Sequence, residues 1–547
     1  MKKHFLRFSI AIFTFVLLSV SLCTAQEVGS YAITNANVVL VSGPTISDAT
    51  VIIRNGLIEA VGKNISVPAD AKVFDGRGLT VYPGFFDTNT DLGIQKIPPT
   101  RGQNAQNNQP QSNSNYPESL RPEQTAAEKL KAGEAQFAAQ RSNGFTTVLA
   151  VEDSGIFEGQ SAVINLAGDS VSAMIIRSPF AQHVAFRTER GGEFPTSLMG
   201  TFAALRQMFL DAKRLDEIRK MYEKNPLGMK RPEKDMALDA LIPVVNREMP
   251  VVFNANTERE IIRVLDLVKE FNLRAIIAGG LEAGKIANRI KAQNIPVLLS
   301  VNFPKRTITE NKEADPEPLE TLRLRVEVPK TAAKLKQAGV KFAFQSGELK
   351  NIGDFLKNVE ETTENGLSKT DAVRALTLDA AEILGVNNQL GSIEKGKIAN
   401  LVVMKGDVFA DDKTITHVFI DGKVFEMPKK PEKKPGDEAT PATTGTTAQV
   451  GGNWTLNIDA SGQSFDSQLV LNQQGNVLTG TLNSTFFGTA QIRNGQINGN
   501  KFSFDVTISI GGEETDASFS GTVSGNKMEG TISAAENPAT FTGTKNP

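Results

Sequence analysis

LSKTDAVRALTLDAAEILGVNNQLGSIEKGKIANLVVMKGD, residues 367–407, runs from a helical pattern through a turn into a strand. The Thr-Leu-Asp-Ala-Ala part is typical of a helix. The Gly-Ser-Ile-Glu-Lys-Gly-Lys segment is typical of a turn, and the Leu-Val-Val-Met run after it is typical of a strand. Strands are therefore predicted for residues 391–427, with Asp421-Gly422 as a hairpin turn.

Upstream of this stretch, two other patterns appear. Residues 31–82 contain short strand-like segments, with Asn55-Gly56 as a hairpin turn. From about residue 126 to 385, amphipathic helical stretches alternate with short apolar runs such as LRAIIAGG and IPVLLSVN. This alternation predicts parallel βα units. About 300 residues of such units is the size of a (β/α)8 barrel.

Three further segments differ in composition. Residues 94–125 are rich in Gln, Asn, Pro and Ser and are predicted to be a disordered insertion, because they have few apolar residues to pack. Residues 428–450 form a Pro/Lys/Thr-rich linker. Residues 451–547 contain short alternating strands separated by Gly-Asn turns, which predicts a separate all-β meander or barrel domain.

The amino terminus predicts export. Residues 1–25 have a basic start, an apolar stretch and a small-residue cleavage site, so a signal peptide cut near Ala25 is predicted, which places the mature chain in the periplasm or outside the cell. Cleavage before Cys23 as a lipoprotein is the alternative. Because Cys23 is the only cysteine, the mature chain has neither disulfides nor thiolate ligands. The net charge of -2 gives no support for nucleic-acid binding.

Residues 31–427 resemble the metal-dependent amidohydrolase superfamily, particularly its imidazolonepropionase-like branch. The similarity is carried by VYPGFFDTNTDLG, by NGFTTVLAVEDSGIFEGQSAVINLAG and by the stretch quoted first. It implies an α/β fold with a (β/α)8 TIM barrel at 86–390 and a composite β-sandwich built from 26–85 and 391–427. It also implies hydrolysis of non-peptide C–N bonds, such as those of cyclic amides.

The resemblance also implies one or two divalent metal ions such as zinc. The ligands would be a His-x-His pair on the first barrel strand, histidines on the fifth and sixth strands, and an Asp on the eighth. This sequence has other residues at the matching positions. They are Asn89 and Asp91 on the first strand, Asn254 on the fifth, Ala278 or Gly279 on the sixth, and Gly347 on the eighth. Amides are weak neutral ligands and glycine supplies no side chain, so neither a metal nor another cofactor is predicted.

Five other residues are weak candidates for the barrel mouth: Glu152, Asp153, His183, Ser346 and Glu348. The acids fall near predicted strand ends, where barrel active sites lie. The reading that we favour is that these acids are solvated or cap neighbouring helices, because acids beside helix starts are common caps. His183 and His417 are the two histidines of the mature chain, too few for a histidine-rich zinc site. A lone histidine such as His183 is more often packed or hydrogen-bonded than a ligand.

Three hypotheses about function follow. The first is a catalytically degenerate protein that binds a ligand in the old pocket or pairs with itself or with a competent relative. The second is an active C–N bond hydrolase, either with Mg²⁺ or Ca²⁺ bound by Asp91 and neighbouring acids or with no metal. The third places attachment to a surface or partner in residues 451–547, through Trp454, Phe486 or Phe487, although core packing is the favoured role of Trp454. No membrane span is predicted.

Overall fold

The computed structural model describes residues 29–95, 116–133, 136–188, 194–305, 317–347, 349–410, 412–427, 448–460, 463–484, 488–510, 513–534 and 539–546. It divides into two compact units, Met1–Lys429 and Lys430–Pro547. The predicted signal peptide, Glu348 and most of the predicted linker lie outside the described residues. Among the helices that the structure describes, none combines the length and the apolar character that crossing a membrane requires.

The two ends of the first unit meet in one eight-stranded sheet. Its order is β18-β17-β16-β5-β1-β2-β3, and β4 pairs with β1. These strands are β1 (Tyr31–Val38), β2 (Ile46–Arg54), β3 (Leu57–Gly62), β4 (Lys72–Asp75), β5 (Leu79–Pro83), β16 (Leu401–Lys405), β17 (Thr414–Ile420) and β18 (Lys423–Glu426). Strand β16 lies antiparallel to β5, so segments more than 300 residues apart in the chain share the middle of the sheet.

Two further sheets of the first unit carry the remaining strands. Their orders are β10-β9-β7-β6 and β15-β14-β13-β12-β11-β8. The strands are β6 (Phe85–Thr90), β7 (Phe145–Ala150), β8 (Phe157–Gln160), β9 (Ala162–Asn165), β10 (Ile175–Arg177), β11 (Gln182–Ala185), β12 (Val251–Ala255), β13 (Ala275–Gly279), β14 (Val297–Ser300) and β15 (Phe342–Gln345). Because β8 and β9 follow one another directly in the chain, this segment links the two sheets on one side.

On the other side, β6 and β15 are the edge strands of the two sheets. The Thr88 hydroxyl donates to the Phe344 carbonyl at 2.8 Å, and the Ser346 N–H donates to Asp87 Oδ1 at 2.8 Å. These two bonds join β6 to β15 and complete the ring of strands. Side chains of this ring that face inward, such as Leu149, Val252 and Leu298, are fully buried.

One segment of the ring departs from the predicted parallel βα pattern. Strand β9 pairs antiparallel with β7, and β8 pairs antiparallel with β11. The pairs β6–β7, β11–β12, β12–β13, β13–β14 and β14–β15 are parallel. Only residues 151–156 separate β7 from β8, whereas a parallel crossover needs about a dozen residues or more. The chain therefore turns back, and the start of β8 lies level with the carboxyl ends of its neighbours.

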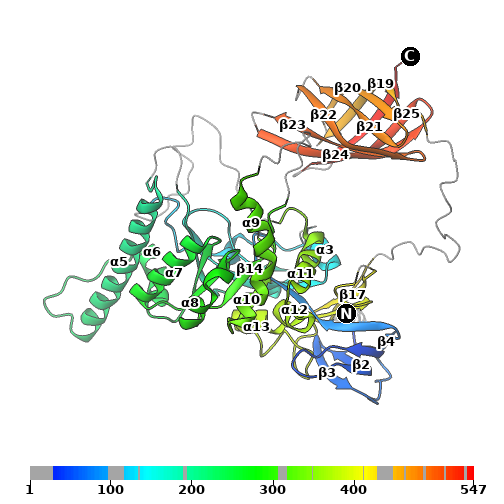
Figure 1. The fold of residues 1–547 in the computed structure, drawn as a ribbon. Helices are drawn as coiled ribbons and strands as arrows, with labels where there is room; N and C mark the ends of the chain where they lie inside the picture. Colours follow the sequence, from blue (N-terminus) through cyan, green and yellow to red (C-terminus); the bar gives the residue numbers. More distant parts are fainter. Residues whose placement is uncertain are drawn as a thin grey trace, which may run out of the picture. The chain divides into compact units, whose positions relative to one another are not determined.

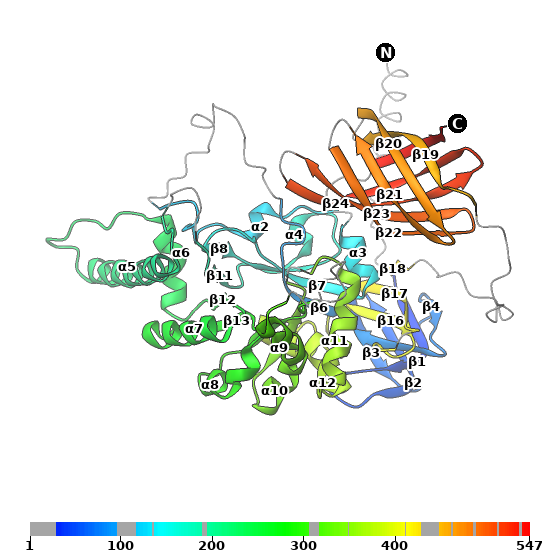
Figure 2. The same ribbon diagram turned by 45° about the horizontal axis from the view of Figure 1, so that its top comes forward.

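Helices lie on the outside of these strands (Figures 1 and 2). The α-helices are α2 (Ala126–Lys129), α3 (Gln136–Ser142), α4 (Val171–Met174), α5 (Leu198–Lys224), α6 (Met236–Val245), α7 (Glu258–Phe271), α8 (Ala287–Ala292), α9 (Leu319–Glu327), α10 (Thr331–Gln337), α11 (Phe355–Glu364), α12 (Lys369–Leu376) and α13 (Leu378–Leu384). Short 3-10 helices are η1 (Ala283–Ile286), η2 (Val328–Lys330) and η3 (Ile352–Asp354). Helix α7 begins with a complete capping box, in which Thr257 and Glu260 satisfy each other's backbone N–H groups.

The predicted disordered insertion is ordered in its last part. Residues 96–115 lie outside the described residues, but 116–125 are placed against β8. Leu120 is 3% exposed and forms a bridge with Phe157, and Thr125 forms one with Gln160. The prediction was wrong for these residues because their order comes from backbone pairing with a distant strand, which local composition does not reveal.

The second unit is a closed barrel of eight antiparallel strands in chain order, with β26 returning to β19 (Figure 1). The strands are β19 (Gly452–Ala460), β20 (Gln463–Gln474), β21 (Val477–Ser484), β22 (Gly488–Asn498), β23 (Lys501–Ile510), β24 (Glu513–Ser524), β25 (Lys527–Ala534) and β26 (Ala539–Lys545). Trp454 is fully buried, and its indole N–H donates to the Val450 carbonyl at 2.8 Å. Trp454 is therefore a core residue, as the favoured reading holds, while Phe486 and Phe487 lie outside the described residues.

The hydrogen bond from Trp454 to Val450 shows that the linker ends earlier than predicted. Val450 is fully buried in the core of the second barrel, and the Ala448 N–H donates to the Gly499 carbonyl at 2.9 Å. Residues 448–450, which composition assigned to the linker, are thus part of the barrel. Polar neighbours in the sequence concealed this role.

Candidate functional site

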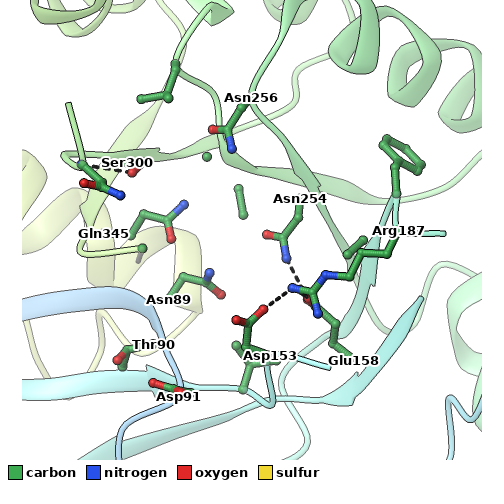
Figure 3. A pocket seen from close by; sticks show the side chains of 18 of the residues that line it. Asn89, Thr90, Asp91, Asp153, Glu158, Arg187, Asn254, Asn256, Ser300 and Gln345 are labelled. Atoms are coloured by element: carbon green, nitrogen blue, oxygen red, sulfur yellow. Dashed lines mark hydrogen bonds and ion pairs between the residues drawn. The ribbon is translucent and has the colours of Figure 1, made fainter. Parts of the chain in front are cut away.

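A cavity of about 490 Å³ opens where the strands of the first barrel end. Its wall is formed by residues at or just beyond the carboxyl ends of β6, β7, β11, β12, β13, β14 and β15, together with the start of β8. Figure 3 shows polar side chains from these strands turned towards one space. Because parallel strands present their carboxyl ends at one rim, residues far apart in the sequence converge here.

All five positions that the resemblance singled out line this cavity: Asn89, Asp91, Asn254, Gly279 and Gly347. Ala278, the other residue considered for the sixth strand, lines it as well. The strands thus bring together one carboxylate, two amides and two residues without a side chain. Strand alternation predicts a shared side for Asn89 and Asp91, and both reach the cavity.

Two of the weaker acidic candidates also line the cavity, and both are paired with bases. The Glu152 carboxylate forms an ion pair and a hydrogen bond with Lys129, and Asp153 does the same with Arg187. Asp153, Arg187 and Glu158 form a linked group at one end of the cavity (Figure 3). Neither acid caps a helix, but the Asp153 side chain is 48% exposed, as the solvated reading expects, and the Glu152 side chain is 25% exposed.

Glu158 is the site residue that the sequence did not single out. Its side chain is 1% exposed, its Oε1 lies 3.0 Å from Arg187 Nη2, and its Oε2 accepts from Asn254 Nδ2 at 2.7 Å. Burial raises the pKa of Glu158 to about 8, although the Arg187 guanidinium opposes this shift. The available signal was an acid inside the apolar run GIFEGQSAVIN, because acids are rarely buried without a partner.

His183 and Ser346, two weak candidates for the barrel mouth, lie away from the cavity, and for His183 this agrees with the favoured reading of a packed or hydrogen-bonded histidine. His183 lies on β11 with no exposed surface, and its Nε2 is 2.9 Å from the Ser161 hydroxyl. Burial lowers the pKa of His183 to about 3, so the ring is neutral. Ser346 is 4% exposed and its N–H binds Asp87. Neither residue lines the cavity, so neither is a residue of the barrel mouth. Glu348 lies outside the described residues.

Asp87 is a second buried carboxyl close to the site. It has no exposed surface, and its Oδ1 accepts the Ser346 N–H described above. Burial raises the pKa of Asp87 to about 6, against the effect of the hydrogen bonds from Ser346. Its position at the junction of β6 and β15 gives it a structural role beneath the cavity.

The residues of the cavity do not fit a transition-metal centre. Such a centre needs imidazole, thiolate or several carboxylates at close range. Within the described ranges, no group of three His, Cys, Asp or Glu side chains is arranged to hold a metal ion. Glu152 and Asp153, which were candidates for an oxygen-ligated Mg²⁺ or Ca²⁺, are already engaged with Lys129 and Arg187.

The amides of the cavity present unsatisfied oxygen atoms. Gln345 is 2% exposed, and its Nε2 donates to the Leu298 carbonyl at 2.8 Å. Gln345 Oε1 and Asn89 Oδ1 are buried and have no hydrogen-bond partner among the described residues. Almost no surface of either oxygen is accessible to solvent, so both are buried within the wall and are not open to the cavity, and an unsatisfied buried polar atom costs about 1–3 kcal/mol.

Comparisons with known proteins agree with this fold. The sequence matches the amidohydrolase family over residues 80–425. A solved amidohydrolase from Thermotoga maritima is similar in structure, with a TM-score of 0.62 and 25% identity, over 73% of this chain and 100% of the other. A Xaa-Pro dipeptidase with bound methionine gives a TM-score of 0.46 and 18% identity over 73% of this chain and 100% of the other. No curated protein matches significantly. Because the family match spans well over half of its residues, this chain belongs to the amidohydrolase family.

Proposed function

We propose that this protein is a non-catalytic member of the imidazolonepropionase-like branch, which binds a small polar ligand in the cavity where its relatives hold metal. One observation carries the proposal. The positions matched to the family's metal ligands all line a single cavity. Among Asn89, Asp91, Asn254, Gly279 and Gly347, only Asp91 has a charged side chain that could bind a metal ion. The cavity is kept while the chemistry of its wall is changed.

The size of the cavity supports a binding role. At about 490 Å³ it lies within the range of about 300–1,000 Å³ that is typical of small-molecule sites. Its wall also includes Ser300, Asn302 and Gln345, which can orient a ligand through hydrogen bonds.

Metal content of the mature protein tests this proposal. The protein should be purified without chelator and with a tag that carries no histidine, and zinc, manganese, magnesium and calcium should be counted. We expect less than about a tenth of an equivalent of each, also after soaking in zinc, because one carboxylate is a poor site. A stoichiometric metal that is lost in Asp91→Ala but kept in the surface control Asp169→Ala, whose side chain is 79% exposed, would contradict the proposal.

A second candidate function rests on Glu158. We propose that, if the protein is a hydrolase, it cleaves C–N bonds without a transition metal, with Glu158 as the proton donor. Support comes from its pKa of about 8, because general acid–base hydrolysis uses one protonated carboxyl beside an ionised one. A screen of cyclic amides and dipeptides tests this idea: turnover should be abolished in Glu158→Gln and kept in the exposed control Glu233→Gln.

We also propose that the protein is exported after cleavage near Ala25, and that it associates with itself or with a competent relative. Support for export comes from the composition of residues 1–25, and support for association comes from the resemblance. The second unit would mediate attachment. Amino-terminal sequencing of the mature protein and its mass in solution test the two ideas, and a mature chain that begins at residue 1 would contradict the first.

A further inference from the structure

Helix α5 carries apolar residues on two opposite sides. Successive residues of a helix lie about 100° apart around its axis, so the sequence alone assigns each residue to a side. One side holds the buried residues, among them Leu205, Met208 and Ala212, which belong to the core of the first unit. The opposite side holds a second apolar row within about 40° of arc, which we call the outer row. It consists of Met199, Ala203, Leu210 and Met221.

The outer row is exposed. Met199 is 85% exposed, and Leu210 and Met221 are each 53% exposed. Phe194, just before the helix, is 56% exposed, and Leu227, shortly after it, is 87% exposed. Helix α5 lies at the edge of the first unit in both views of the fold (Figures 1 and 2). A surface helix normally has one apolar face, which the core accounts for here, so the outer row calls for a partner.

The residues that border the outer row are mostly basic. Three exposed bases lie within about 60° of it and have no ion-pair partner among the described residues: Lys213, Arg214 and Lys224. Glu217 is the one acid on this face. Two more bases at the border, Arg206 and Lys220, are already held in ion pairs and add nothing to this excess. On a chain whose net charge is -2, this face therefore favours an anionic partner.

The spacing of the outer row decides which kind of anionic partner fits. A helix that packs along another helix needs an apolar residue about every 3.5 positions, so a seam over residues 199–221 would need about six or seven. The outer row offers four, and one of them is an alanine. A second copy of the chain would also bring like charges together, because the same bases border the row in each copy. A lipid surface needs no matching seam, since scattered apolar side chains enter it singly.

We propose that the outer face of α5 makes a peripheral contact with an anionic lipid surface. The outer row enters the boundary between headgroups and acyl chains, and Lys213, Arg214 and Lys224 contact the headgroups. The helix lies along the surface and does not cross it. No residue of the outer row lines the cavity, so this contact is independent of what the cavity binds. It is also distinct from the attachment proposed for the second unit.

Sedimentation with vesicles tests this assignment. The full mature protein should be mixed at low ionic strength with vesicles of phosphatidylcholine alone, or with vesicles that contain about 30% phosphatidylglycerol. We expect binding to the anionic vesicles to be at least about tenfold tighter, because each base near such a surface adds to the attraction. Most of this difference should be lost at about 0.5 M salt, which screens exposed charges.

Variants locate the contact on the helix. Leu210→Gln should weaken binding to the anionic vesicles at least about threefold, while Leu319→Gln, which alters a leucine of α9 that is 61% exposed, should bind as the parent does. Arg214→Glu should weaken binding at least about tenfold, and the exposed control Arg323→Glu should not. Met199→Gln, at a side chain that is 85% exposed, repeats the apolar test if Leu210→Gln fails to fold.

Three outcomes of the sedimentation would overturn the assignment. They are no binding to the anionic vesicles, equal affinity for the two compositions, and binding that Leu210→Gln and Arg214→Glu leave unchanged. The mass of the lipid-free protein in solution tests the competing partner. A dimer that Leu210→Gln converts to a monomer would assign the outer row to a second copy of the chain and would also overturn the lipid contact.

Discussion

The chain contains two barrels that use their interiors in different ways. In the second unit, inward positions are mostly apolar, as Ala539 and Phe541 on β26 show, although Ser467 and Ser484 are also buried in this unit. Trp454, Phe504 and Phe541 fill that interior and are at most 2% exposed. In the first unit, the lower interior is equally apolar, but Asn254 and Gln345 stand at its mouth.

The interior of the second unit is thus a packed core, whereas the mouth of the first barrel encloses a cavity; we call the second arrangement a container. Apolar interiors gain stability from burial and need no partners. The mouth of the first barrel instead carries acceptors without donors and acids whose pKa values are raised by burial. Each such feature costs stability, so we propose that the first barrel gives up stability to keep a polar cavity.

The largest effect should come from the filled barrel. Phe504→Ala removes a ring that is 1% exposed and stacks on Phe519 at a centroid distance of 4.9 Å. We expect a loss of about 3–5 kcal/mol in the free energy of unfolding of the second unit. Trp454 is the only tryptophan, so its fluorescence during urea unfolding reports this unit alone.

The matched control for that change is Val477→Ala on the same barrel. Val477 is 55% exposed, so its truncation should cost less than about 0.5 kcal/mol. Equal losses for Phe504→Ala and Val477→Ala would show that the interior is not the source of stability, and the distinction between a core and a container would fail.

A smaller effect should appear as a pH dependence of the first unit only. The pKa of Glu158 in the folded state is about 8, above its usual 4.5, so the folded state keeps a proton that the unfolded chain releases. Stability is then greatest below about pH 4.5 and falls as the pH rises towards 8. Asp87 acts in the same direction but only up to about pH 6, so Glu158 dominates between pH 6 and 8.

Over that window we expect a loss of about 2–3 kcal/mol in the free energy of unfolding, at about 1.4 kcal/mol per unit. Circular dichroism at 222 nm reports the first unit, because the described helices all belong to it. Glu158→Gln should flatten this slope, while the fluorescence of Trp454 should show no matching slope in either protein. An unchanged slope in Glu158→Gln would mean that Arg187 keeps the carboxyl ionised.

The smallest effects concern the two glycines of the cavity wall. Gly279 has a φ of +91°, and a Cβ there would lie 2.4 Å from Asn256 Oδ1, whereas Gly347 has a φ of +56° and its nearest contact would be Ser300 Oγ at 3.0 Å. We expect Gly279→Ala to cost about 2 kcal/mol and Gly347→Ala about 1 kcal/mol. Gly43→Ala, without a positive φ, is the control, and urea unfolding followed at 222 nm measures all three.

The result bears on why glycine occupies these positions. A large cost at Gly279 would mean that the backbone itself requires glycine there. If Gly279→Ala is as stable as the parent protein, the backbone does not require glycine at this position. The glycine then reflects only the loss of a metal-binding side chain.

Local signals predicted part of this fold. Asn55-Gly56 and Asp421-Gly422 form the expected hairpin turns, with φ values of 52° and 78° in the first and 52° and 75° in the second. Asn and Gly tolerate positive φ, so such turns can be read from two residues. The convergence of Asn89, Asn254 and Gly347 on one cavity followed from the resemblance, because their side chains alone carry no such signal.

Other features depend on partners that are distant in the sequence. The direction of β8 and β9 was missed although the short link 151–156 was readable, because an apolar run looks the same in either direction. Glu158 was missed because its importance comes from Asn254 and Arg187, which follow it by 96 and 29 residues. The packed and hydrogen-bonded role favoured for His183 is found, but its partner Ser161 could not be identified from the sequence.

The junction between β6 and β15 determines how the barrel of the first unit is closed. These strands are the edges of two sheets, and the bonds that cross between them come from Thr88 and Asp87. Two side chains take the place of a continuous backbone ladder, and one of them is a carboxyl that protonates near pH 6. Asn89 and Gln345 line the cavity on opposite sides of this junction. A ligand that contacted both residues would hold the two strands together and slow deuterium uptake along both of them.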